Sequence, residues 1–437
     1  MRSIPILVAG AGASGMLAAI TAARQGAKVL VIEKNNRPGK KLLATGNGRC
    51  NYTNRVQQPE CYRCSQLDYP ETVLRYFDAD TTVEWFRELG ILPKDRDGYI
   101  YPLSGQATSV RNVLERTMSQ DRNITLQCEE VITDIIPRYE VSGMTKTAGQ
   151  HTSDSIGEKH KITGYEVHTD RGKYMARCLI LAMGGAAAPA QGTTGDAYSI
   201  LSAMGIQLIN PLPALTSVEL NERCCKEWAG VRIHGQVSLW RDEVLIGKES
   251  GEIQMVAQGI SGIPVFQLSG IVSRQIDTGN VPVFTLDCLP DFSEEELKQE
   301  LMRRVDFLRE SGSLGDVLEG MLPDKLSSAL LKDIQLKKDK PASLLQKEEL
   351  CENLITQIKN KVLRIKRVSG FEKAQVTSGG VDTRQFLPET VELQSYPGLY
   401  ITGELADVDG ICGGYNLQWA WSSGHLAGMQ AAERVVG

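Results

Sequence analysis

The chain has 437 residues, of which 42% are hydrophobic and 23% are charged, and its net charge is −5. It is too long for one ordinary domain and has ample material for a core, so two or three globular domains are expected. The acidic balance and the lack of a dominant basic patch argue against a nucleic-acid partner.

The N-terminal segment has the pattern of a βαβ unit. Ile4–Ala9 is a short apolar run that predicts a buried parallel strand. Gly10–Gly15 then predicts a turn, and Met16–Arg24, which is rich in Ala and Leu, predicts a helix. Lys28–Glu33 predicts a second buried strand.

The turn in this unit has the spacing Gly10-x-Gly12-x-x-Gly15, and Glu33 ends the second strand. Gly10 permits a tight turn, Gly12 lets a pyrophosphate approach the backbone, and Gly15 allows close packing of helix on strand. The N-terminus of the helix offers free N–H groups to phosphates. Because an acid at Glu33 accepts hydrogen bonds from ribose hydroxyls and repels a 2′-phosphate, the motif predicts FAD or NAD rather than NADP.

Two other interpretations of the N-terminal region are less favoured. Ser3–Ala23 carries no charge, as a signal or membrane segment would, but the glycine spacing is better explained by a dinucleotide loop. No other stretch is apolar and long enough to span a bilayer, so no membrane partner is expected. The ten cysteines are scattered and no export signal is visible, which predicts a cytoplasmic protein. Cys61-x-x-Cys64 lacks the second ligand pair that zinc requires, so no metal is expected.

The next segments alternate between loop, helix and strand patterns. Pro38–Asn54 predicts a long glycine-bearing loop, Glu71–Leu89 a helix, and Ile124–Ile136 one or two strands. Val141–Lys161 is polar and predicts an exposed loop or hairpin tip. Cys178–Ala182 predicts a further buried strand, which runs into a pair of glycines.

The pattern changes after about residue 205. Apolar and polar residues alternate from Val231 to Leu239, and Val281–Leu286 is a further short strand, which together predict a small antiparallel sheet or barrel. Helical periodicity follows, from a capping box at Ser293 to about Lys366.

Strand patterns and glycine clusters return near the C-terminus. We therefore expect an α/β fold in which residues 1–204 and 367–437 form one Rossmann-type FAD-binding domain split across both termini. A β-rich, barrel-like insert at 205–290 and a helical insert at 291–366 would interrupt it.

The C-terminal segment favours FAD over NAD. Leu399–Gly403 predicts a strand, Glu404 follows it, and a final helix begins near Asn416. A carboxylate such as Glu404 can hold ribityl hydroxyls, and the N-terminus of the last helix can face the flavin edge where negative charge gathers on reduction. A plain NAD dehydrogenase needs no such segment.

Four segments resemble the signature motifs of the BaiN/YhiN family of FAD-dependent oxidoreductases. They are Gly39–Asn51, Met183–Asp196, Thr377–Val381 and Gly403–Ala420, and they extend from the start of the chain to its end. The resemblance implies a split FAD domain with an inserted β-rich subdomain and a helical subdomain. One departure is Asn47, where many members have glycine.

The resemblance, together with the glycine motif, gives a set of candidate residues for binding non-covalent FAD. It places Ser14 at the helix start and Val131 near the adenine. The full set is Gly10, Gly12, Ser14, Gly15, Glu33, Lys34, Lys41, Gly46, Arg49, Cys50, Asn51, Val131, Gly184, Glu404, Gly414, Asn416 and Leu417.

The implied activity is hydride transfer through flavin N5 to a small organic substrate, with an enone or steroid-like acceptor. NAD(P)H is the expected donor, and because no second GxGxxG is present it would dock transiently. An amine or other flavin oxidase, a tRNA-modifying flavoprotein and a non-catalytic flavin-binding protein stay open as alternatives. The catalytic acid or base is unassigned among Tyr415, Arg49 and His234. The substrate and the oligomeric state are also open.

Overall fold

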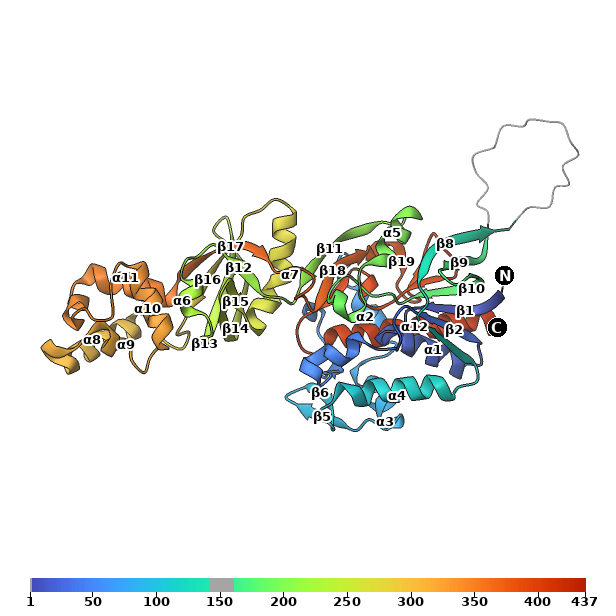
Figure 1. Cartoon of the computed structure of the whole chain (residues 1–437), viewed down its shortest axis with the longest axis horizontal. Coiled ribbons are helices and arrows are strands. Elements are labelled where there is room, and N and C mark those ends of the chain that lie inside the picture. Colours follow the sequence, from blue (N-terminus) through green and yellow to red (C-terminus); the bar gives the residue numbers. More distant parts are fainter. Residues whose placement is uncertain (1, 141–160) are drawn as a thin grey trace, which may run out of the picture. The chain divides into compact units, whose positions relative to one another are not determined.

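A computed structural model of the chain describes residues 2–140 and 161–437. The polar segment 141–161, expected to be an exposed loop, lies outside the described residues except for Lys161. The chain forms two compact units, one of residues 1–211 and 376–437 and the other of residues 212–375 (Figure 1). We call them the terminal unit and the inserted unit.

The core of the terminal unit is a parallel sheet in the order β21-β10-β1-β2-β7. Its bounds are Arg2–Ala9 for β1, Val29–Glu33 for β2, Ile124–Cys128 for β7, Lys173–Leu181 for β10 and Leu399–Ile401 for β21. The central strands are near-continuous apolar runs because helices or loops cover both faces of the sheet. The predicted βαβ unit and the α/β class are confirmed.

Antiparallel strands extend this sheet beyond the parallel core. The segment predicted as one or two strands forms two, because β7 ends at Cys128 and β8 spans Ile132–Tyr139. Between them Glu129 has a φ of +60°, which turns the chain. The other additions are β9 (Ile162–Thr169), β19 (Phe386–Leu387) and β20 (Glu392–Leu393).

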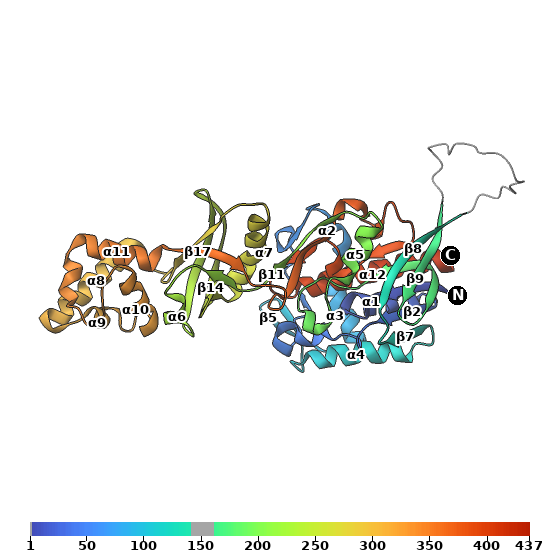
Figure 2. The ribbon, with the colours of Figure 1, turned by 45° about the horizontal axis from the view of Figure 1, so that its top comes forward.

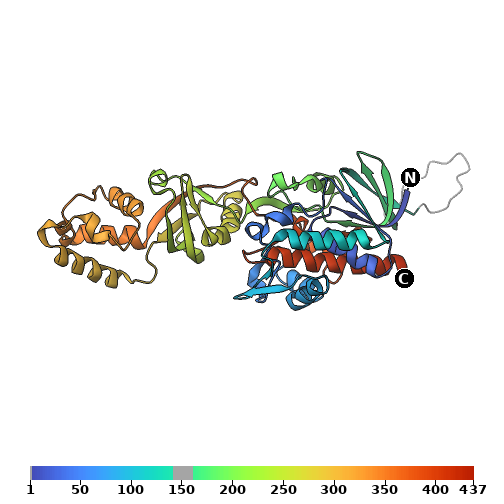
Figure 3. The same ribbon diagram turned by 60° about the horizontal axis from the view of Figure 1, so that its bottom comes forward.

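Two helices from opposite ends of the chain pack together against the sheet. They are α1 (Ala13–Arg24) and α12 (Tyr415–Val436), and Figure 3 shows them alongside α4 (Ala107–Gln120). Gly424 and Gly428 face α1, where any Cβ would overlap the backbone of Ser14 and Ala18. Glycine therefore sets the short distance between the two helix backbones.

The segment predicted as one helix over Glu71–Leu89 is two helices. They are α2 (Tyr69–Leu74) and α3 (Ala79–Glu88). The prediction missed the break because it followed apolar periodicity and overlooked Asp78. The Asp78 side chain accepts a hydrogen bond from the Thr81 N–H and starts a new helix there.

The terminal unit also holds shorter elements, which connect the sheet and helices. They are η1 (Lys41–Gly48), β3 (Thr53–Asn54), η2 (Pro59–Cys61), β4 (Tyr62–Cys64), β5 (Pro93–Arg96), β6 (Tyr99–Pro102), η3 (Pro189–Gln191), α5 (Asp196–Ala203), β18 (Val376–Val381), η6 (Thr383–Gln385), η7 (Gly403–Leu405) and β22 (Val408–Gly410). Strand β11 (Leu208–Ala214), which pairs with β18, spans the boundary between the units.

The inserted unit contains a closed antiparallel barrel in the order β12-β15-β14-β13-β16-β17. Ile233, Val237 and Leu239 point into its core, as the alternating pattern predicted. The predicted strand at Val281 begins only at Val283, and Val281 itself is 82% exposed. The strands are β12 (Val218–Leu220), β13 (Arg232–Arg241), β14 (Val244–Val256), β15 (Gly259–Ser261), β16 (Val283–Asp287) and β17 (Lys361–Val368).

Helices complete the inserted unit (Figure 2). Their buried residues join those of the barrel in one hydrophobic cluster. The predicted capping box at Ser293 is present, with both hydrogen bonds formed to Glu296. The bounds are α6 (Cys225–Trp228), α7 (Ile263–Asp277), α8 (Glu294–Leu308), η4 (Arg309–Ser311), α9 (Leu314–Leu318), α10 (Asp324–Asp333), η5 (Ala342–Gln346) and α11 (Glu348–Lys359).

Candidate functional site

The parallel strands of the terminal unit bring distant candidate residues to one edge of the sheet. β1, β2, β10 and β21 run in the same direction, so the segments that follow them leave at the same edge. These segments carry Gly10–Gly15, Glu33, Gly184 and Glu404. The crevice at the carboxyl ends of parallel strands is where open α/β sheets bind ligands.

The glycine loop leaves room at one position and none at the other two. Gly10 has a φ of +97°, and a Cβ there would overlap the carbonyl oxygen of Ala182. A Cβ at Gly15 would overlap the Gly10 carbonyl oxygen. At Gly12 the nearest atom would be 4.0 Å away, and no side chain caps the helix that begins after it. The uncapped N–H groups of α1 therefore face open space, as an anion site requires.

Glu33 lies beside this loop with only 7% of its surface exposed. Its Oε2 accepts a hydrogen bond of 2.7 Å from the Ala11 N–H, and its Oε1 accepts one of 2.8 Å from the Asn35 N–H. The adjacent Lys34 donates to Thr194 Oγ1 at 2.7 Å and pairs with Asp196. Backbone donors thus hold the Glu33 carboxylate in place at the end of β2, while Lys34 ties this edge to α5.

Val131 lies next to the same end of β2. The Glu130 N–H donates to the Glu33 carbonyl at 3.1 Å, which fixes this turn beside the acid. The Val131 side chain is 38% exposed, and its N–H donates to Asp170 Oδ1 at 2.9 Å. The Val131 side chain is therefore an exposed apolar group close to Glu33.

The loop of residues 39–51 has an unusual backbone. Gly46, Asn47 and Cys50 have φ values of +56°, +54° and +58°. Asparagine is among the few non-glycine residues that tolerate the left-handed region, which explains how Asn47 replaces glycine here. Arg49 is exposed, whereas Cys50 is fully buried, and burial raises the pKa of its thiol to about 12. Cys50 is thus a neutral thiol and not a reactive thiolate.

Lys41 and Glu404 meet in a half-buried ion pair, with 2.6 Å between Lys41 Nζ and Glu404 Oε2. The other carboxylate oxygen, Oε1, accepts hydrogen bonds from the N–H and the hydroxyl of Thr377, at 2.9 and 2.8 Å. Thr377 Oγ1 in turn accepts from the Ala186 N–H at 2.9 Å. This network joins the 39–51 loop, β18, η7 after β21, and the segment that follows the glycine pair after β10.

The start of α12 lies beside the end of the 39–51 loop, where a Cβ at Gly414 would meet the Asn51 side chain. Gly414, with a φ of +97°, precedes the helix, and no side chain caps it. Asn51 is 8% exposed, and its Oδ1 is buried without a hydrogen-bond partner within the described residues. The Asn416 side chain binds both the N–H and the carbonyl of Gly410, at 2.9 and 2.7 Å. Leu417 packs partly buried against the core.

These features fit an extended dinucleotide. The two uncapped helix N-termini supply N–H groups, and Glu33 and Glu404, which follow different strands, supply carboxylate acceptors. The unpartnered Asn51 oxygen is the kind of buried acceptor that a ligand donor would satisfy, because leaving it unpaired costs about 1–3 kcal/mol. The residues present therefore fit FAD.

The candidates for the catalytic acid or base are divided between the two units. His234 is exposed on β13 in the inserted unit. Tyr415 is buried at the start of α12, and burial raises the pKa of its phenol. On the same helix as Tyr415, Trp419 and Trp421 are buried and donate to backbone carbonyls. In the part of the chain that the structure describes, no His, Cys, Asp and Glu side chains cluster as metal ligands would.

Tyr198 on α5 is a further candidate residue that the sequence patterns did not indicate. Its hydroxyl is buried and has no hydrogen-bond partner in residues 2–140 and 161–437. Burial, and then the nearby charges of Glu404 and Asp407, raise the pKa of this phenol. No sequence motif marked it, because only the fold brings α5 beside Glu404.

The parallel sheet, the glycine loop and the acid at the end of β2 define a Rossmann-type dinucleotide-binding protein. A family model described as HI0933-like protein Rossmann domain matches residues 4–430. The chain therefore belongs to the HI0933-like family of FAD-dependent oxidoreductases, and the resemblance to the BaiN/YhiN family is confirmed.

Relatives with assigned functions match the chain over nearly its full length. The 3-dehydro-bile acid delta(4,6)-reductase of Clostridium scindens is 36% identical over 98% of both chains. The ribosomal RNA dihydrouridine synthase of Escherichia coli is 26% identical over 97% of this chain and 96% of its own. The corresponding synthase of Haemophilus influenzae is 26% identical over 98% of both.

Among solved structures, a 3-ketosteroid delta1-dehydrogenase from Sterolibacterium denitrificans shares the fold. Its TM-score is 0.50 at 13% identity, over 99% of this chain and 100% of that one. Within residues 2–140 and 161–437, no helix combines the length and the apolar character needed to cross a bilayer.

Proposed function

We propose that this protein is a FAD-dependent reductase of a carbon–carbon double bond conjugated to a carbonyl group, acting on a small steroid-like substrate. The proposal rests on one structural observation. The same edge of the sheet carries both the glycine loop with Glu33 and the Lys41–Glu404 ion pair. The relative at 36% identity is named as a reductase of a 3-dehydro-bile acid, and its name supports the substrate class.

Each part of the edge has a proposed task. The N–H groups at the start of α1 bind the pyrophosphate, and Glu33 binds the adenosine ribose. Lys41 and Glu404 hold the ribityl chain, and the start of α12 faces the pyrimidine end of the flavin. FAD, when bound, supplies hydride transfer through N5.

The overall reaction adds one hydride and one proton across the double bond. We propose NAD(P)H as the hydride source, so that NAD(P)⁺ is the oxidised product and the saturated carbonyl compound is the reduced one. The proton comes from an acidic group or from water. Hydrogen bonding to the substrate carbonyl would favour hydride addition, because negative charge develops on that oxygen.

Visible absorption of the purified protein, followed by anaerobic addition of NADH or NADPH, tests the proposal. Oxidised-flavin bands that bleach, and that return on addition of a 3-oxo-Δ4 steroid with formation of the saturated product, would support it. Protein that cannot retain FAD after reconstitution would contradict the cofactor assignment. Flavin that bleaches but is reoxidised by no conjugated enone would contradict the substrate assignment.

A second candidate is the reduction of uridine in RNA, because two relatives are named as ribosomal RNA dihydrouridine synthases. Uracil also presents a double bond conjugated to a carbonyl, so the same hydride chemistry applies. The two candidates separate when reduced protein is offered a steroid enone and unmodified ribosomal RNA in parallel. Dihydrouridine detected by mass spectrometry, with the steroid unchanged, would favour this second function.

A further inference from the structure

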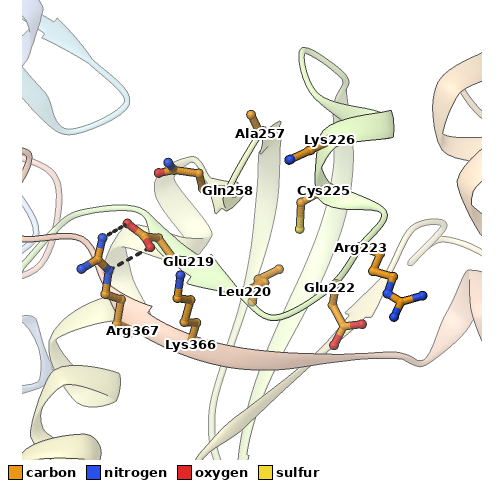
Figure 4. Close-up of a pocket in the computed structure, with 10 residues that line it drawn as sticks. All are labelled: Glu219, Leu220, Glu222, Arg223, Cys225, Lys226, Ala257, Gln258, Lys366 and Arg367. Atoms are coloured by element: carbon orange, nitrogen blue, oxygen red, sulfur yellow. Dashed lines mark hydrogen bonds and ion pairs between the residues drawn. The ribbon is translucent and has the colours of Figure 1, made fainter.

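The inserted unit has a pocket of about 480 Å³ on the outside of its barrel (Figure 4). Four segments form its walls: β12, the start of α6, the turn between β14 and β15, and β17. This volume is within the range of small-molecule sites. No residue of this pocket belongs to the dinucleotide edge.

Both carboxylates that line the pocket are already neutralised. Glu219 is 7% exposed, and its two oxygens accept hydrogen bonds of 2.8 and 2.9 Å from the Arg367 guanidinium. Glu222 accepts from the N–H of Arg364 at 3.0 Å and from its guanidinium at 3.4 Å. The acidic groups therefore leave little negative charge to offer a ligand.

Three cations that line the same pocket have no such partner. Arg223, Lys226 and Lys366 form no ion pair with a carboxylate within the described residues. Figure 4 shows the ammonium groups of Lys226 and Lys366 on opposite sides of the hollow. The Arg367 hydrogen bonds, and then the charges of Lys366 and Lys373, lower the pKa of Glu219, as expected where the local potential is positive.

We propose that this pocket binds a small phosphorylated molecule through Lys226 and Lys366. Three unpaired cations call for an anion with more than one charge, which a pyrophosphate or phosphate monoester carries and a single carboxylate does not. The cations gather in a hollow of a chain with net charge −5 and form no long basic stripe. A small ligand therefore fits better than a nucleic acid, which needs an extended basic surface.

Isothermal titration calorimetry of the full chain with inorganic pyrophosphate, in the presence of saturating FAD, tests this proposal directly. Binding should weaken at least tenfold in the double variant Lys226→Glu/Lys366→Glu. The matched control is Lys337→Glu/Lys347→Glu, which makes the same charge change at exposed lysines of the same unit and should bind as the wild type does. Thermal unfolding checks that both variants fold.

Equal binding by both double variants, or no binding by the wild type, would overturn the proposal. Binding of a short single-stranded RNA that depends on Lys226 and Lys366, without pyrophosphate binding, would overturn it in favour of a nucleic-acid surface. Binding of NADP⁺ that weakens in the Lys226→Glu/Lys366→Glu variant and not in the control would support it and identify a nucleotide as the source of the phosphate. Saturating FAD occupies the start of α1 in every titration, so the pyrophosphate readouts report on the pocket of the inserted unit, and none of them depends on turnover.

Discussion

Lys41 Nζ lies 2.6 Å from Glu404 Oε2, although the two residues are 363 positions apart in the sequence. Glu404 is held from its other side by Thr377, so the carboxylate cannot turn away when its cation is removed. The ion pair therefore holds the Glu404 carboxylate in place. Sequence patterns suggested Lys41 and Glu404 separately but could not show that the two side chains meet.

Replacing Lys41 should weaken flavin binding. In Lys41→Met the Glu404 carboxylate keeps its Thr377 bonds but loses its counter-charge, so we expect the Kd for FAD to rise about tenfold, or ~1.4 kcal/mol. Quenching of FAD fluorescence on titration with apoprotein measures this. The neighbouring exposed Lys40 gives the control Lys40→Met. A Kd that is equal in both variants would remove Lys41 from the site.

Alanine substitutions at two glycines of the loop should separate binding from folding. At Gly12 an added Cβ meets nothing closer than 4.0 Å, so Gly12→Ala should fold with a loss of about 1 kcal/mol and lose FAD. At Gly15 the Cβ overlaps the Gly10 carbonyl, so Gly15→Ala should lose FAD and also about 3 kcal/mol of stability. Urea unfolding and flavin absorbance report the two effects. Retained flavin in Gly12→Ala would contradict the pyrophosphate assignment.

Stability should fall at acid pH because of His425. Burial lowers the pKa of this imidazole to about 4. The unfolded chain takes up a proton near pH 6.5 and the folded protein only near pH 4, so this contribution is complete above pH 6.5 and is lost between the two values. Its size is about 3 kcal/mol.

His425→Gln should reduce the acid sensitivity of folding, as measured by urea unfolding between pH 7.5 and pH 4.5. The difference between variant and wild type isolates His425 from the carboxylates that titrate over the same range. The ring stacks on Phe77 at 4.5 Å, so some stability is lost at every pH. An unchanged pH profile in the variant would show that His425 does not titrate as described.

We expect the unpartnered hydroxyl of Tyr198 to form a hydrogen bond with a bound ligand. Tyr198→Phe should leave stability unchanged or raise it by up to about 1 kcal/mol, since a buried unpaired group is removed. It should also lower flavin affinity or kcat/KM about tenfold, because the ligand loses a hydrogen bond. Fluorescence titration and steady-state kinetics measure these quantities.

A paired tyrosine provides the control for that experiment. The Tyr396 hydroxyl donates to the Met204 carbonyl, so Tyr396→Phe should cost about 1 kcal/mol and leave flavin affinity alone. If Tyr198→Phe instead destabilises the protein without any effect on flavin or turnover, the hydroxyl has only a structural role.

Local sequence patterns correctly predicted the features that depend on interactions between residues close in the sequence. The buried strands beside the glycine loop and the capping box at Ser293 depend on neighbouring residues, and the structure confirms them. The break before α3 was missed because one capping side chain, Asp78, outweighs apolar periodicity. The Lys41–Glu404 pair and the environment of Tyr198 depend on contacts across the whole fold, which no short pattern encodes.

The close packing of α1 on α12 through Gly424 and Gly428 has a consequence for biosynthesis. The glycine loop is translated before the inserted unit, but the helix that packs behind it is translated after the entire inserted unit. A nascent chain therefore carries the glycine loop without the helix that packs behind it until late in translation. We expect cofactor loading to follow completion of α12, so that ribosome-bound chains arrested before residue 415 do not retain flavin.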